Sequence, residues 1–317
     1  MEAVVNVVLP VFGIILAGYL AGVYRVLGQA SSEALNPFVF YVALPVLLFH
    51  SLAGVEAARA LNGPFLLAYG AGQAITMALA MAFACVVYKA RLADASVFGL
   101  TALFGNTGYL GIPLAALAFG VAGALPAIVA TAFQSAVFIG LAAALIEIDL
   151  GRRSQTSAGM ASIVRHALLA VLRNPLFVAP ALGIAWSLIG LPLPGPVDTF
   201  CRILGSAAGP AALFSIGLFL VGKPFGENVK PVTALSVFKL LLHPLITAFL
   251  CFRVFDVDPL WAKIAVLMAA LPAGANCFVL ARHYGIAVER TSAAILATTV
   301  ASVVTLAAIM GSWGGTP

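Results

Sequence analysis

FGNTGYLGIP (residues 104–113) and LPAGANCF (residues 271–278) are the two stretches that decide the fold of this chain. Each places Asn, Gly and Pro in the middle of an apolar run, and these residues weaken a helix because Gly is too flexible and Pro lacks an N–H. Lipid cannot satisfy the main-chain groups that an opened helix exposes, so such breaks are tolerated only inside protein or beside a wet cavity. The pattern predicts two broken membrane helices at a functional site.

The composition of the whole chain predicts an integral membrane protein. Of its 317 residues, 63% are hydrophobic and 9% are charged, whereas about 25% are charged in an average soluble domain. Apolar runs of about 20 residues recur along the chain, and each is long enough to cross about 30 Å of hydrocarbon as a helix. We predict an all-α protein with ten transmembrane helices, at residues 4–23, 34–54, 64–88, 96–120, 123–147, 175–191, 197–222, 231–255, 260–282 and 290–312.

The two halves of the chain are similar to each other. LPVLLFHSLAG (residues 44–54) and GPAALFSIGLFLVG (residues 209–222) share Pro-x-x-Leu-Phe, and the broken helices are the fourth and the ninth. Five helices per half is an odd number, so the second half enters the membrane from the opposite side, as in many transporters. We predict a first five-helix repeat at 1–148, a cytoplasmic linker with a short amphipathic helix at 149–174, and a second, inverted repeat at 175–317.

The basic residues predict the orientation of the chain. Lys and Arg gather in alternate loops, and such loops are retained in the cytoplasm; they hold Arg25, Lys89, Arg91, Arg152, Arg153, Arg165, Arg173, Lys223, Lys230, Arg282 and Arg290. We expect a multi-pass protein of the cytoplasmic membrane with both termini periplasmic. The net charge of +5 does not indicate nucleic acid as a partner, because the basic residues form no continuous face.

The broken helices supply the candidate binding site. If the two breaks cross, their half-helix N-termini direct partial positive charge at one point, which suits a carboxylate, and Asn amides can donate to its oxygens. The alternative is a pair of kinks stabilised by Ser, Thr or water, with the Asn residues only capping half-helices. The candidate substrate-binding residues are Asn106, Thr107, Gly108, Gly111, Pro113, Pro272, Gly274 and Asn276.

Four polar residues inside the spans are candidate supporting groups. Lys239 either extends its stem to the headgroups or faces the helix bundle, where it would compensate the broken-helix C-termini or the substrate. His243 lies on the same helix face and either titrates or packs beside Pro244. Gln73 and Gln134 need polar partners at mid-span, so either could line a cavity.

The chain carries no motif for enzymatic chemistry. It has no nucleotide-binding Gly-rich motif, no His/Cys metal pattern and no catalytic carboxylate pair. The cysteines, none of them in a CxxC, read as reduced packing residues; they are Cys85, Cys201, Cys251 and Cys277. We expect neither an enzyme nor a bound cofactor or metal.

Five stretches resemble the auxin efflux carrier family, which includes plant PIN-type carriers and bacterial malonate-type permeases. They are YVALPVLLFHSLAG (41–54), FGNTGYLGIPLA (104–115), NPLFVAPALGI (174–184), PAALFSIGLFLVG (210–222) and ALPAGANCFVLARHYG (270–285). The resemblance implies a scaffold of helices 1, 2, 6 and 7, a mobile transport domain of helices 3–5 and 8–10, elevator-like movement and a homodimer. By motif, Asn106 and Pro113 match the first crossover, and Pro272 and Asn276 match the second.

The sequence thus favours a secondary transporter or facilitator of a small organic anion. No acidic residue lies inside helix 3, so malonate or another small carboxylate is expected in preference to auxin. One alternative is a sodium- or proton-coupled symporter or antiporter of bile-acid-symporter-like architecture, which normally uses buried carboxylates or clustered hydroxyls. The other is a membrane receptor, which would bind its ligand without counterflow.

Overall fold

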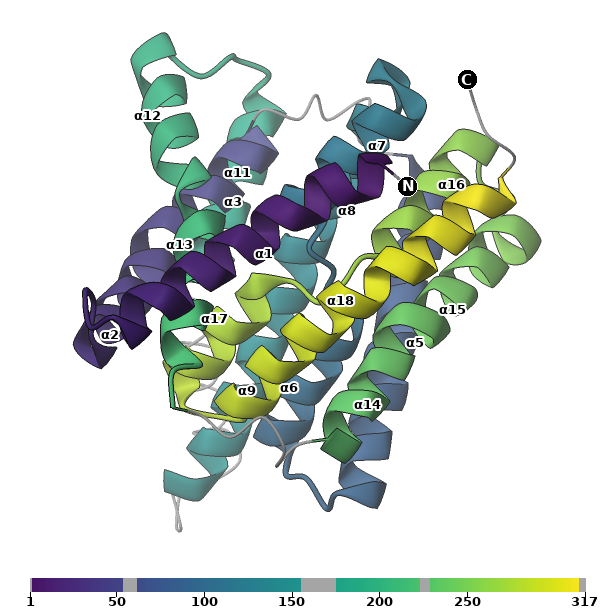
Figure 1. Ribbon diagram of the computed structural model, residues 1–317. Helices are drawn as coiled ribbons and strands as arrows, with labels where there is room; N and C mark the ends of the chain where they lie inside the picture. The colour runs from purple at the N-terminus through teal and green to yellow at the C-terminus, as the bar shows by residue number, and fades with distance from the viewer. Residues whose placement is uncertain (1, 54–61, 155–174, 223–228, 314–317) are drawn as a thin grey trace.

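The computed structural model describes residues 2–53, 62–154, 175–222 and 229–313, and the regular elements in these ranges are helices (Figure 1). The described residues contain no β-strand, and a single isolated antiparallel bridge joins Gly105 to Ala273. A helix satisfies its main-chain hydrogen bonds within one segment, which is what a lipid environment requires. The all-α membrane fold that the composition predicts is confirmed.

Six continuous helical stretches among the described residues are long and apolar enough to cross a membrane. Several of them contain a π-helical turn, labelled η, between two α-helical parts. They lie in α2 (Gln29–Phe38) with η1 (Val39–Ala43) and α3 (Leu44–Ala53); α5 (Gly63–Val87); α8 (Val121–Gln134) with η3 (Ser135–Ile139) and α9 (Gly140–Ser154); α12 (Gly195–Ser206) with α13 (Ala208–Phe219); α14 (Val229–Val237) with η4 (Phe238–Leu242), α15 (His243–Phe249) and η5 (Leu250–Val254); and α18 (Val288–Ser312).

Two of the expected spans are split into separate pieces. The span expected at 96–120 consists of α6 (Leu92–Leu103), η2 (Thr107–Gly111) and α7 (Ile112–Phe119), and that at 260–282 consists of α16 (Pro259–Ala270) and α17 (Ala275–Tyr284). The 12 residues of α6 or α16 extend about 18 Å, which is well short of about 30 Å of hydrocarbon. The remaining helices are α1 (Glu2–Val23) and α11 (Pro175–Ile189).

The predicted linker is largely outside the described residues. The boundary expected at residue 148 falls inside α9, which continues past the charged residues Glu147 and Asp149 to Ser154. Residues 155–174, where the amphipathic helix was predicted, are not among those described.

Two helix pairs pack through glycines, and together they form one part of the molecule. α1 packs along α13, and α11 packs along α3. A Cβ on Gly18 would strike the carbonyl oxygen of Phe214, and one on Gly183 would lie 2.6 Å from that of Phe49. Small residues let membrane helices approach closely where the hydrophobic effect between them is weak.

The other helices form a second bundle around the two broken spans. α5 packs against α6 and α15, α16 packs against α8 and α15, and α14 packs against α18. Buried aromatic rings fill this bundle near one end; for example, Phe65 stacks on Tyr69 and meets the edge of Trp261. Most residues of α6 and α16, the first parts of the two broken spans, are buried within this bundle.

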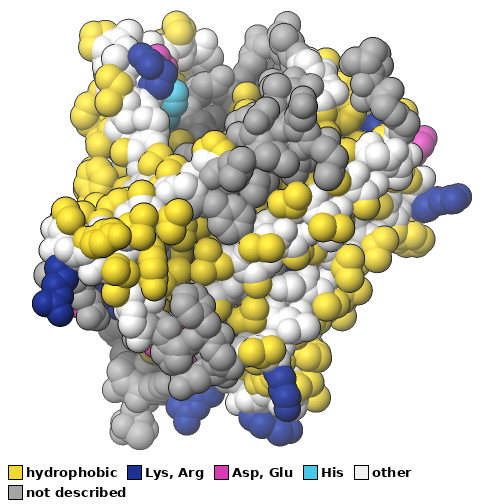
Figure 2. Space-filling view, viewed as in Figure 1, with side chains coloured by type: hydrophobic (Ala, Val, Ile, Leu, Met, Phe, Trp, Pro, Cys, Tyr) yellow, Lys and Arg dark blue, Asp and Glu magenta, His cyan; other side chains and the backbone are white. Residues whose placement is uncertain are grey.

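The start of α1 and the end of α18 lie at the same end of the molecule, the upper one in Figure 1. The loop between α5 and α6, the end of α9 and the start of α14 lie at the opposite end, the lower one in Figure 1. Figure 2 shows Lys and Arg side chains gathered at this lower end, below a broad band of hydrophobic side chains. Other Lys and Arg side chains lie at the top left, at the left and at the right of the same view.

Candidate functional site

The two broken spans cross and pair with each other through their main chains. The N–H of Asn106 donates to the carbonyl of Pro272 at 2.8 Å, and the N–H of Gly274 donates to that of Phe104 at 2.9 Å. These two bonds flank the antiparallel bridge between Gly105 and Ala273. Each break thereby satisfies main-chain groups that the other exposes, as an interruption buried in a membrane protein must.

Gln134 completes the hydrogen bonding of the first break. Its Nε2 donates to the carbonyl of Gly105 at 3.0 Å, while its Oε1 accepts from the N–H of Gly105 at 3.2 Å. The same Oε1 accepts from Gln73 at 2.9 Å and lies 3.3 Å from the Tyr69 hydroxyl. Nε2 also lies 3.4 Å from Oγ1 of Thr107. The side-chain amide of Gln134 thus pairs with the main chain of Gly105 as a neighbouring peptide group would.

Thr298 has the corresponding role at the second break. The N–H of Ala273 donates to Oγ1 of Thr298 at 3.1 Å, and the Thr298 hydroxyl donates to the carbonyl of Ala294 at 2.7 Å. Sequence reasoning missed Thr298. The available signal is the pair of adjacent hydroxyl residues, Thr298 and Thr299, at mid-span of the last helix.

Lys239 lies behind the crossover. Its side chain is fully buried, and Nζ donates to the carbonyl of Ala269 at 2.7 Å and lies 3.2 Å from Nδ1 of His243. A Cβ built on Gly105 would lie 3.5 Å from this Nζ. Of the two alternatives for Lys239, the structure has the side chain facing the bundle at the C-terminal end of α16. His243 is equally buried and is the polar neighbour of Lys239.

A cavity of about 180 Å³ opens on the opposite side of the crossover. The N-terminal ends of η2 and α17 border it, so it receives the partial positive charge of unpaired main-chain N–H groups. Its volume is below the roughly 300–1,000 Å³ of pockets for drug-sized ligands. Polar groups of the cavity come from Asn106, Thr107, Thr131, Ser135, Ser206 and Asn276, and its apolar lining includes Leu47, Leu48, Phe104 and Ile112.

The family of the chain follows from comparison with known proteins. The sequence profile of the family described as "Membrane transport protein" matches residues 3–310. The chain belongs to this family, which is that of the auxin efflux carriers.

Three relatives match nearly the full chain. A protein of Rhizobium meliloti named "Putative malonate transporter" is 30% identical and covers 98% of this chain and 96% of its own. An "Uncharacterized transporter" of Methanothermobacter thermautotrophicus is 31% identical over 94% of this chain and 95% of its own. "Auxin efflux carrier component 5" of Arabidopsis thaliana is 23% identical over 92% of each chain.

The predicted binding residues of this family member divide into three groups. Asn106, Thr107, Gly108, Gly274 and Asn276 line the cavity. Gly111 and Pro272 are not among its lining residues: a Cβ on Gly111 would lie 2.6 Å from Sδ of Met268, so this glycine permits close packing of the two broken spans. Pro113 lies at the start of α7, and its side chain is outside the described part.

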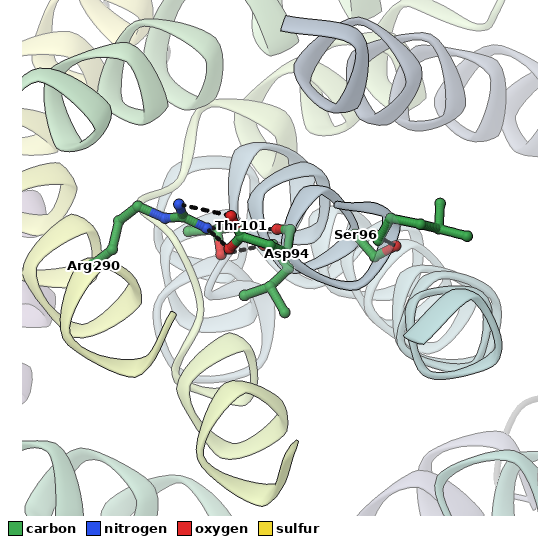
Figure 3. A network of polar contacts seen from close by, with 6 residues as sticks. Asp94, Ser96, Thr101 and Arg290 are labelled. Atoms are coloured by element: carbon green, nitrogen blue, oxygen red, sulfur yellow. Dashed lines mark hydrogen bonds and ion pairs between the residues drawn. The ribbon is translucent and has the colours of Figure 1, made fainter. Parts of the chain in front are cut away.

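Two of the arginines in the basic loops form ion pairs that join different helices. Figure 3 shows Arg290 of α18 reaching Asp94 in the first turn of α6, with 2.6 Å between the guanidinium and the carboxylate. The Arg290 guanidinium also lies over the ring of Phe98, 5.2 Å from its centroid. Arg282 pairs more loosely with Glu33 at 3.6 Å. Sequence reasoning treated both arginines only as determinants of topology, because their carboxylate partners are distant in the chain.

Proposed function

We propose that this protein is a secondary transporter or facilitator that carries a small carboxylate across the cytoplasmic membrane. The observation that carries the proposal is the cavity at the crossing of two broken spans, in a chain that belongs to a family of membrane transport proteins. Binding sites between interrupted helices near the middle of the membrane are characteristic of secondary transporters.

The lining of the cavity favours a carboxylate. Asn106 and Asn276 present amides, Thr107, Thr131, Ser135 and Ser206 present hydroxyls, and no acidic side chain is among the lining residues. Two half-helix N-termini add partial positive charge without a full cation in the cavity itself. The relative named as a malonate transporter supports malonate, or a dicarboxylate of similar size, as the first substrate to test.

The architecture that we propose is ten spans in two inverted repeats of five. In two equivalent repeats, span 1 (α1) corresponds to span 6 (α11), and span 2 (α2–α3) corresponds to span 7 (α12–α13). The contact of α1 with α13 then corresponds to the contact of α11 with α3, and the structure contains both contacts. In both pairs a glycine meets the carbonyl of the phenylalanine in the shared Pro-x-x-Leu-Phe motif, Phe214 or Phe49. Gln134 and Thr298, on the helices that follow the two breaks, satisfy equivalent main-chain groups.

This symmetry supports an elevator mechanism. In our proposal α1, α2–α3 and α11–α13 form a scaffold, and the helices of the second bundle carry the cavity across the membrane. The cavity lies where the two parts meet, because Leu47, Leu48 and Ser206 come from the scaffold and the other lining residues come from the mobile part. We expect two copies to associate through their scaffolds.

Replacing Asn106 or Asn276 with Ala tests the function. Each change removes an amide donor from the cavity, so exchange of labelled malonate in proteoliposomes should fall to background while the protein stays folded, membrane-inserted and dimeric. Asn62→Ala is the matched control: Asn62 caps α5 away from the cavity, so this variant should lose about 1 kcal/mol of stability and keep its transport. If both cavity variants exchange malonate at the wild-type rate, the site lies elsewhere.

A further inference from the structure

Lys239 is a buried basic residue that has no carboxylate partner among the described residues. Its side chain has no exposed surface, and none of the ion pairs among the described residues includes it. An isolated charge at membrane depth is costly, so it needs either a partner or a function that repays the cost.

The two groups that contact Lys239 compensate it only in part. The carbonyl of Ala269 belongs to the last turn of α16, where the unpaired carbonyls carry a partial negative charge. Nδ1 of His243 lies 3.2 Å from Nζ, and an imidazole that accepts from an ammonium is neutral and contributes only a dipole. Neither group is a carboxylate, so a protonated Lys239 leaves a net positive charge at the crossover.

The missing counter-charge has a place on the other side of Gly105. The main chain of this glycine lines the cavity. A Cβ built on Gly105 would lie 3.5 Å from Nζ of Lys239, so the ammonium is close behind it. No carboxylate is among the lining residues that the structure describes. An anion in the cavity would thus be separated from the ammonium by the thickness of the paired main chains, in surroundings of low polarity where charges act over longer distances than in water.

We propose that Lys239 is the built-in counter-charge of the transported anion, so that the transport unit loaded with a singly charged anion crosses the membrane without net charge and without a metal cation. This inference rests on the proposed function. It adds which substrate charge allows the loaded transport unit to move without carrying net charge across the membrane. A doubly charged anion would move with one uncompensated negative charge. Loss of the Lys239 ammonium would make the net charge of the loaded transport unit more negative by one, for the singly and for the doubly charged anion alike.

The dependence of exchange on membrane potential measures this charge directly. A full elementary charge moved across the membrane changes an equilibrium by up to about 50-fold per 100 mV, and a rate by several-fold. Two probes of similar shape separate the cases: malonate, with two carboxylates, and malonamate, in which one carboxylate is replaced by an amide. Homoexchange of each labelled probe would be measured in sodium-free proteoliposomes, with the potential set by potassium gradients and valinomycin.

In the wild type, exchange of malonamate should be independent of the potential, and exchange of malonate should change several-fold per 100 mV. In Lys239→Gln, malonamate exchange should acquire the dependence that malonate shows in the wild type, while Lys239→Arg should keep the wild-type pattern because the charge remains. Lys230→Gln is the matched control, since Lys230 is exposed near the start of the same membrane span; it removes one charge of the same kind and should leave both responses unchanged.

The outcomes test carboxylate transport and the counter-charge role of Lys239 separately. Absence of exchange of either probe by the wild type would overturn the proposed carboxylate transport and this inference with it. Exchange with equal voltage dependence for both probes, or with a strict requirement for sodium, would leave the transport function standing and overturn the role of Lys239. The wild-type comparison is informative even where Lys239→Gln does not fold.

Discussion

Gln134 is the residue on which the geometry of the first break depends most directly. One side-chain amide accepts from and donates to the main chain of Gly105 and also accepts from Gln73. An apolar residue of similar size at this position would leave all three partners buried without hydrogen bonds, each at a cost of about 1–3 kcal/mol.

Gln134→Leu should therefore destabilise the protein by about 3 kcal/mol or more and reduce transport more than Gln134→Asn, which keeps the amide on a shorter stem. Thermal unfolding in detergent and malonate exchange would be measured together. Ser96→Ala is a suitable control, because the buried Ser96 hydroxyl donates only to the carbonyl of Leu92 in its own helix (Figure 3), and it should change neither quantity appreciably. A Gln134→Leu variant as stable and active as the wild type would show that the break is held by other contacts.

At the scale of elements, glycines determine how closely the helices of the proposed scaffold approach. Gly217 of α13 lies against α1 so closely that a Cβ would strike the carbonyl oxygen of Ile15 and lie 2.7 Å from the N–H nitrogen of Tyr19. Both obstacles are main-chain atoms, which cannot move aside as a flexible side chain can.

We expect Gly217→Ala to separate α1 from α13 and to cost about 1–3 kcal/mol, the usual range for overpacking. Gly13→Ala provides the control on α1 itself: a Cβ there would meet no atom within 4 Å, and Ala is the better helix former. The melting temperatures of the two variants in detergent should thus move apart, with only Gly217→Ala lowered. Equal melting temperatures would contradict the packing of α1 on α13.

At the scale of the whole molecule, the distribution of charge along the bilayer axis determines its orientation. The end opposite the start of α1 and the end of α18 carries the loop of Lys89 and Arg91, the start of α14 with Lys230, the last turn of α17 with Arg282, and the first turn of α18 with Arg290. Short loops rich in Lys and Arg remain in the cytoplasm.

Reporter fusions should therefore place both termini in the periplasm and the 149–174 segment in the cytoplasm. A reporter that is active only outside the cytoplasm should be active after Pro317 and silent within 149–174, and a reporter of cytoplasmic location should give the reverse pattern. The opposite result at both positions would invert the orientation. A result that puts both positions on the same side of the membrane would contradict the five spans expected between them.

The breaks in the two spans were predictable from sequence because the weakness of a helix is a local property. Asn, Gly and Pro within a few residues at 104–113 and 271–278 disfavour continuous helix wherever the segment lies. Hydrophobicity is equally local, and so the membrane class and the family resemblance could be derived before any coordinates.

Tertiary structure alone decided how these parts meet. The pairing of Gly105 with Ala273, the use of Thr298 as a hydrogen-bond partner and the inward direction of Lys239 depend on helices far apart in the chain. A polar side chain in an apolar helix must find a partner, but its own sequence neighbourhood does not identify that partner. The sequence by itself determined where the chain breaks and in what solvent it folds; only the packing of the helices decided which main-chain groups the breaks share, because those hydrogen bonds form between segments whose separation the local sequence does not encode.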